Sequence, residues 1–118
     1  MDSKGQVRQF TTGATRDTDK YKFDYEGFLS PQVLYAYAQY MHKHRKQSDG
    51  TLRDSDNWQK GIPRAQYMKS LWRHFMEFWS WHRNSCGHYD EIATELLCAI
   101  MFNTMGYLHE VLKGRDVE

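Results

Sequence analysis

Two carboxylates stand out on the most apolar segment of this chain. Residues 90–113, DEIATELLCAIMFNTMGYLHEVLK, predict a helix that is apolar over most of its circumference. Glu91 and Glu95 lie one turn apart on the remaining stripe. Neighbouring carboxylates on a buried helix repel each other unless a cation lies between them. The pattern therefore indicates a divalent-metal site, and the alternative is a solvated helix start where Asp90 and Glu91 complement the helix dipole.

A third acidic ligand would have to come from another helix, and Glu77 is the best candidate. Mg²⁺ or Mn²⁺ prefers oxygen ligands, and two carboxylates one turn apart can reach the same ion. Glu77 falls on the face away from the apolar stripe of its own helix, so it could instead be a solvated partner of Arg73. A second subunit packed against that face would reconcile the two interpretations.

Cations and a flat ring elsewhere in the chain could hold a phosphorylated nucleotide. Lysine can act as a point charge on phosphate, and tryptophan can stack on a base. His74 could contact a phosphate or orient a carboxylate, although a single helix histidine is more often structural, and Trp58 could simply pack beneath its loop. The candidate substrate-binding residues are Lys20, Lys22, Arg53, Trp58, Lys60, Arg73 and His74.

Lys20 and Lys22 are expected in an N-terminal arm, and the other candidates on helices and a long loop. Ser30 followed by Pro31 predicts the start of a helix that runs to about residue 46, and Pro63 opens a second helix that ends near residue 83. Residues 48–62 are loop-like and rich in functional groups, which favours contact with a ligand. The expected core stripe of the second helix comprises Met68, Leu71, Trp72, Phe75 and Trp79.

The predicted fold class is all-α: a three-helix bundle in residues 30–118, preceded by an irregular arm in residues 1–29 with a short extended piece around residues 21–25. Three helices leave too little chain to cover the last helix on every side. We therefore expect a second copy to complete the core, giving a homo-oligomer, either a dimer or a tetramer.

Composition excludes several classes of function. A net charge of +1 over 118 residues provides no general field for a nucleic-acid polymer. No apolar run is long enough to cross a membrane, and the polar start has no signal sequence, so a cytoplasmic protein is expected. Cys86 and Cys98 are too few for a disulfide framework, and the histidines show no zinc spacing. Neither a phosphate-binding glycine loop nor a Ser/His/Asp arrangement is visible.

Four segments resemble a known family: GATRDTDKYKFDYEGFLSP, SDGTLRDSDNWQKGIP, YMKSLWRHFMEFW and ELLCAIMFNTMGYLHE. They look like the phage-borne dATP/dGTP diphosphohydrolase N-terminal family, which is similar to the MazG-type all-α nucleoside triphosphate pyrophosphohydrolases. The similarity extends from about Gly13 to Glu110. Its most specific part is the run NWQKGIP, followed by a helix that carries an Arg-His pair.

The resemblance implies hydrolysis of purine deoxynucleoside triphosphates to monophosphate and pyrophosphate, with Mg²⁺ or Mn²⁺ held by helix carboxylates. It places catalysis and metal binding at Glu91 and Glu95, a further metal ligand at Glu77 and a substrate contact at Asn103. A phage enzyme of this kind would act in the host cytoplasm. The E-x-x-E and E-x-x-D motifs of MazG-type enzymes are both incomplete here, so two alternatives stay open. The first is a non-catalytic protein that sequesters a nucleotide or a nucleotide-derived signal. The second is a structural partner in a phage complex.

Overall fold

The structure is a computed structural model that describes residues 7–18, 20–85 and 90–118. It is mostly helical, with one small sheet. The chain divides into two compact units, Met1–Pro31 and Gln32–Glu118. Cys86 and His88, which belong to no recognisable zinc spacing in the sequence, lie outside the described residues.

The first unit contains a short hairpin and one helical turn. Strands β1 (Val7–Gln9) and β2 (Thr15–Asp17) pair in antiparallel fashion. Gly13 has a φ of 89°, a conformation that glycine adopts without strain, and it lies in the turn between the strands. Helix α1 (Tyr25–Phe28) follows Asp24, whose carboxylate accepts a 3.0 Å hydrogen bond from the Gly27 amide. The expectation of an irregular arm with an extended piece at 21–25 was thus wrong, because the paired strands lie earlier and are too short to show periodicity.

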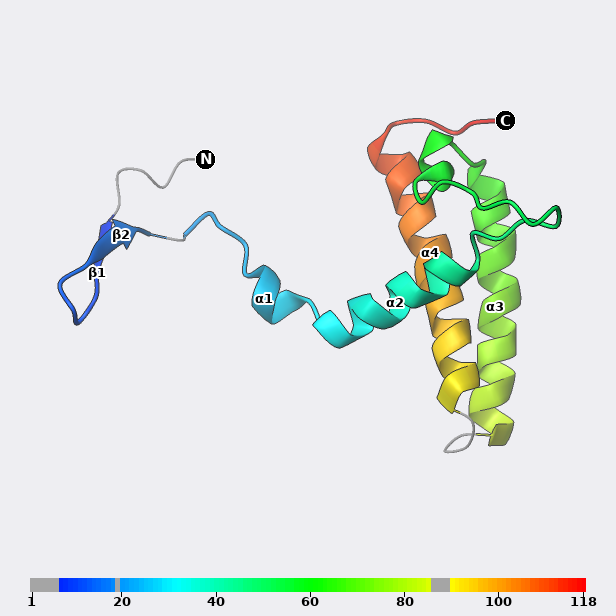
Figure 1. The fold of residues 1–118 in the computed structure, drawn as a ribbon, viewed down its shortest axis with the longest axis horizontal. Coiled ribbons are helices and arrows are strands. Elements are labelled where there is room, and N and C mark those ends of the chain that lie inside the picture. The colour runs from blue at the N-terminus through cyan, green and yellow to red at the C-terminus, as the bar shows by residue number, and fades with distance from the viewer. Residues whose placement is uncertain (1–6, 19, 86–89) are drawn as a thin grey trace. The chain divides into compact units, whose positions relative to one another are not determined.

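The second unit contains the three expected helices: α2 (Pro31–Lys43), α3 (Arg64–Ser85) and α4 (Asp90–Leu112). Helices α3 and α4 run side by side in opposite directions (Figure 1). The connection between α2 and α3 is more ordered than expected. It contains a backbone bridge between Lys46 and Leu52 and the 3₁₀ helix η1 (Asn57–Lys60).

Helix α4 buries a different face from the one that its apolar pattern predicts. The buried residues are mostly small or polar: Ala93, Cys98, Ala99, Asn103, Gly106 and Glu110. Tyr67 of α3, only 2% exposed, lies so close to Gly106 that a Cβ atom there would overlap its ring. The missing side chain at Gly106 makes room for the Tyr67 ring, and this contact turns the small-residue face of α4 inward.

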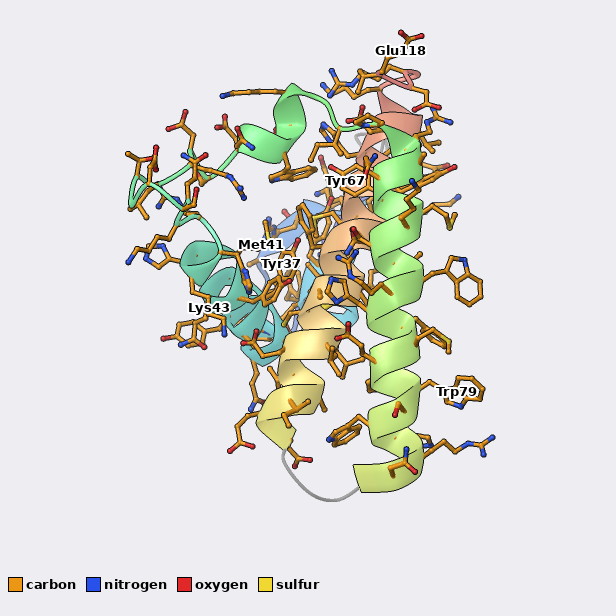
Figure 2. The ribbon with its side chains drawn as sticks, turned by 90° about the vertical axis from the view of Figure 1, so that its right-hand side faces the viewer. Tyr37, Met41, Lys43, Tyr67, Trp79 and Glu118 are labelled. Carbon is orange, nitrogen blue, oxygen red and sulfur yellow. The ribbon has the colours of Figure 1, made fainter. Side chains whose placement is uncertain are left out.

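The large apolar side chains of both helices remain at the surface of the single chain. Trp72 of α3 is 61% exposed and Leu108 of α4 is 53% exposed. Figure 2 shows Trp79 pointing away from the α3–α4 pair. Within one chain, the prediction that these stripes form the core was therefore wrong. The expected core residues that lie at the surface are Met68, Trp72, Phe75 and Trp79.

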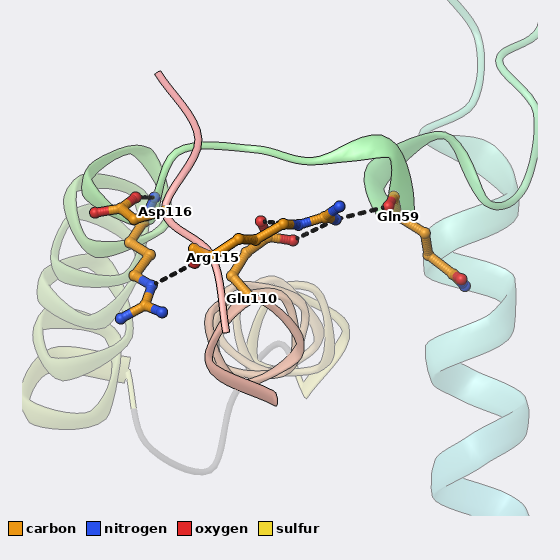
Figure 3. Close-up of polar contacts among 5 residues, drawn as sticks. Gln59, Glu110, Arg115 and Asp116 are labelled. Atoms are coloured by element: carbon orange, nitrogen blue, oxygen red, sulfur yellow. Dashed lines mark hydrogen bonds and ion pairs between the residues drawn. The ribbon is translucent and has the colours of Figure 1, made fainter. Parts of the chain in front are cut away.

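A polar cluster fastens the C-terminal tail to the start of α3 and to η1 (Figure 3). Glu110 is fully buried, and its two carboxylate oxygens accept hydrogen bonds of 2.8 and 3.0 Å from Arg115. Arg115 also donates to the Gln59 carbonyl at 2.8 Å. The carboxylate of Asp116 accepts a 3.0 Å hydrogen bond from the Arg64 amide, which satisfies one of the free N–H groups at the start of α3. We call Gln59, Arg64, Glu110, Arg115 and Asp116 the C-terminal clasp.

None of the helices in the described part of the chain is long and apolar enough to cross a membrane.

Candidate functional site

A pocket of about 550 Å³ lies in the second unit. Its walls come from α2, the connection 44–62, α3 and α4, four parts of the sequence that the fold brings together. The volume falls within the range of small-molecule sites, which are typically concave and lined by aromatic groups with a few placed polar ones. This pocket is the candidate functional site.

The wall beside η1 is aromatic. Trp58 meets His109 edge to face, with ring centroids 4.9 Å apart, and meets Phe102 at 6.2 Å. The C-terminal clasp holds this wall in place, since Arg115 binds both the Gln59 carbonyl next to Trp58 and the buried Glu110 of α4. The clasp therefore fixes the position of the tryptophan relative to α4, although it is not itself part of the pocket lining.

Polar groups from α3 and α4 meet in the same pocket. Asn103 is 5% exposed, and its Nδ2 donates a 2.8 Å hydrogen bond to the Ala99 carbonyl. Its amide oxygen and the second proton of Nδ2 are the groups that it can offer to a ligand. His74 also lines the pocket, and its Nδ1 atom is buried with no hydrogen-bond partner in the part of the chain that the structure describes. A buried polar atom without a partner requires a physical explanation, and a bound ligand is one such explanation.

The charges around the pocket are mainly positive. Arg45 and Arg53 line it, together with His42 and His44, whereas Asp54 is the single carboxylate in its described lining. Such a set suits an anionic ligand better than a bare cation. Burial raises the pKa of Tyr37 on α2 to about 12, and the nearby Tyr40 makes a smaller contribution in the same direction. The Tyr37 hydroxyl therefore stays protonated at neutral pH.

Glu95, a predicted metal ligand, is paired with cations of this chain. Lys43 at the end of α2 forms a salt bridge with Glu95, and His44 Nε2 lies 3.8 Å from its other carboxylate oxygen. Glu91 and Glu77 are exposed. Among residues 7–18, 20–85 and 90–118, no three His, Cys, Asp or Glu side chains assemble into a metal site. An open Mg²⁺ site needs only one or two protein carboxylates, because water and substrate phosphates provide the other ligands.

The pocket is lined by four of the predicted substrate contacts: Arg53, Trp58, His74 and Asn103. Lys60 is exposed on η1 and Arg73 is exposed on α3, and neither lines the pocket. The other two candidates belong to the first unit: Lys22 is exposed, and Lys20 places its Nζ 5.4 Å from the Tyr21 ring centroid.

Several pocket residues were not among the predicted contacts. Arg45 was expected inside the helix that runs to about residue 46, whereas the helix stops at Lys43 and Arg45 lines the pocket. Asn57 precedes Trp58 in the specific run NWQKGIP and also lines the pocket, so its place in that run was a usable signal. Arg115 of the clasp, which lies outside the pocket lining, carried no signal of its own in the sequence.

The fold and pocket define a helical protein with a nucleotide-sized, cationic and aromatic cavity. The sequence matches the family described as dATP/dGTP diphosphohydrolase, N-terminal, over residues 11–118. The chain belongs to this family, whose name denotes a hydrolase. Comparison with curated proteins and with solved structures gives no match. The likeness to MazG-type enzymes stays a prediction.

Proposed function

We propose that this protein hydrolyses purine deoxynucleoside triphosphates, dGTP or dATP, to the monophosphate and pyrophosphate, and that the nucleotide binds in the pocket of the second unit. One observation carries the proposal. Trp58 from NWQKGIP and His74 from the Arg-His pair, the two most specific parts of the family resemblance, lie in one pocket with Asn103. Family membership supplies the reaction class.

In this proposal the pocket binds and orients the nucleotide. Trp58 offers a ring face for the base, since aromatic stacking accepts any base. His74 is placed to hold a phosphate oxygen or the attacking water, which would give its unpaired ring nitrogen a partner. Mg²⁺ or Mn²⁺ would neutralise the triphosphate and lower the pKa of the attacking water, with Glu91 and Glu95 as ligands and Glu77 as a third.

A second copy of the chain belongs to the same proposal. The apolar stripes of α3 and α4 are exposed in one chain, and an exposed apolar patch of this kind is typical of a subunit interface. A homo-oligomer, either a dimer or a tetramer, would cover them and bring Glu77 near another subunit. Light scattering coupled to size exclusion should give a mass of at least twice 14.1 kDa. A purely monomeric protein would contradict this part.

The direct test is pyrophosphate release from dGTP and dATP with Mg²⁺ or Mn²⁺. Release should occur with the purine deoxynucleotides and stop when EDTA removes the metal. The variant Trp58→Leu should raise KM, while Tyr35→Leu, at an exposed position of α2 outside the pocket lining, should leave KM unchanged. Absence of release from any nucleotide, under metals that bind, would remove the catalytic proposal.

One observation favours a second function, capture of a nucleotide without turnover. Glu95 already pairs with Lys43, and no cluster of three possible ligands forms in the described part of the chain. Calorimetry separates the two functions. A sequestering protein binds dGTP tightly in EDTA and releases no pyrophosphate, whereas the enzyme needs metal for turnover. In either case we propose a role in nucleotide-pool control for a phage, in the host cytoplasm.

A further inference from the structure

We propose that residues 45–53 are the triphosphate-binding element, with Arg45 and Arg53 on the phosphates at the pocket mouth and the base at the inner end against Trp58 and Asn103. The inference rests on the proposed function, because it assumes a nucleotide ligand. Under this inference, Arg45 and Arg53 bind the phosphates in place of Lys20, Lys22 and Lys60. The nucleotide then lies in the pocket in one defined orientation.

Residues 45–53 form a small, internally bonded hairpin. The Arg53 amide donates to the Arg45 carbonyl at 2.8 Å, and Arg45 Nε donates back to the Arg53 carbonyl at 2.7 Å. The turn is closed by a 2.8 Å hydrogen bond from the Gln47 amide to the Thr51 carbonyl, and Gly50 takes a φ of 87°. These bonds hold the two arginines side by side before any ligand arrives, which lowers the entropic cost of binding.

The two arginines suit a polyphosphate. Arg45 uses Nε for the hairpin and keeps its two terminal nitrogens, while no hydrogen bond of the Arg53 guanidinium is recorded within the described residues. Paired guanidinium nitrogens match two oxygens of one phosphate group, a fit that the single ammonium of lysine cannot reproduce. His42 and His44 also line the pocket.

The solvent exposure of the lining residues distinguishes the open end of the pocket from its inner end. Arg53 is exposed and Arg45 is half-buried, so the cationic side adjoins solvent. Asn103 is 5% exposed, and Trp58 and Phe102 are half-buried. A triphosphate is strongly hydrated and favours the open side, whereas a base gains from apolar burial. The free amide oxygen of Asn103 is an acceptor, and it suits the exocyclic amino group or ring N–H of a purine.

Calorimetry with three probes in EDTA tests this orientation without turnover: sodium tripolyphosphate, deoxyguanosine and dGTP. Arg53→Gln should weaken tripolyphosphate and dGTP about tenfold and change deoxyguanosine less than about twofold, because one charge-assisted phosphate contact is lost. Arg53→Lys should recover only part of the loss. Asn103→Ala should show the opposite pattern, weakening deoxyguanosine and leaving tripolyphosphate unchanged.

Lys69→Gln provides the matched control, since Lys69 is an exposed cation of α3 outside the pocket lining. Thermal melts should show that Arg53→Gln folds like the wild type, because the hairpin bonds use the Arg53 backbone. If Arg53→Gln binds tripolyphosphate as well as Lys69→Gln does, the orientation is wrong while the proposed function stands. If wild-type protein binds neither dGTP nor dATP, in EDTA or with Mg²⁺, the proposed function fails, and the orientation fails with it.

Discussion

In the C-terminal clasp, Glu110 is fully buried and both of its carboxylate oxygens accept hydrogen bonds from Arg115. In His74, which lines the pocket, the buried Nδ1 atom has no hydrogen-bond partner among the described residues. Both regions place polar groups against the same helix pair. A buried polar group that has its partner stabilises the fold, and one that lacks a partner can gain by binding a ligand. The clasp is therefore expected to govern stability, and the pocket is expected to govern activity.

The largest expected effect is on stability, at the close contact that adjoins the clasp. Gly106→Leu would place a side chain into the space filled by the Tyr67 ring, and overpacking of this kind costs about 1–3 kcal/mol or more. The melting temperature followed by circular dichroism should fall sharply. Thr104→Leu, at an exposed position of the same helix, is the control and should change it little. Equal melting temperatures for the two variants would mean that the helices do not pack this closely.

The clasp should also make stability depend on pH. Hydrogen bonds from Arg115 hold the pKa of Glu110 below its usual value of 4.5. Because the folded pKa is the lower one, the pair contributes fully above pH 4.5, and its contribution is lost as the pH falls through the folded pKa. Glu110→Gln should lower the melting temperature at pH 7 and flatten its decline in acid, while exposed Glu118→Gln should do neither. An unchanged acid profile for Glu110→Gln would contradict the role given to the clasp.

The pocket should respond in the opposite way. His74→Ala should reduce pyrophosphate release by about a hundredfold if His74 handles a proton, or about tenfold if it only binds phosphate. The melting temperature should change little, because Nδ1 gives up no hydrogen bond. His82→Ala, an exposed histidine farther along α3, is the matched control. A loss of stability without a loss of activity would reverse the comparison between pocket and clasp.

The smallest stability effect is expected at the Lys43–Glu95 pair, where both side chains are about half exposed. Such surface pairs contribute up to about 1 kcal/mol. Lys43→Met should therefore leave the melting temperature nearly unchanged. If Glu95 is a metal ligand, the same change should tighten Mn²⁺ binding measured by electron paramagnetic resonance, because the competing cation is gone. Lys46→Met is the control, and equal Mn²⁺ affinity in both variants would remove Glu95 from the proposed metal site.

Local signals in the sequence were sufficient to locate the three long helices, but not α1 or η1. Pro31 fixes the φ angle that starts α2, Pro63 precedes the start of α3 by one residue, and Asp90 is the first residue of α4. The short hairpin of the first unit escaped detection, because three-residue strands give no measurable alternation. Trp58, His74 and Asn103 were each recognisable as candidate ligand contacts, although nothing local placed them in one pocket.

The sequence by itself thus determined the helical class, the family and several pocket residues, because these depend on residue types and spacings within single segments. The tertiary structure decided which helix faces turn inward, since the Tyr67 ring packs directly on Gly106 and outweighs the apolar pattern of α4. It also decided that Arg45 and Arg53 lie beside the pocket and that Glu110 is buried with Arg115. The pocket forms only where separate segments meet in space, and the burial of Glu110 depends on the packing around α4 rather than on its spacing from Arg115.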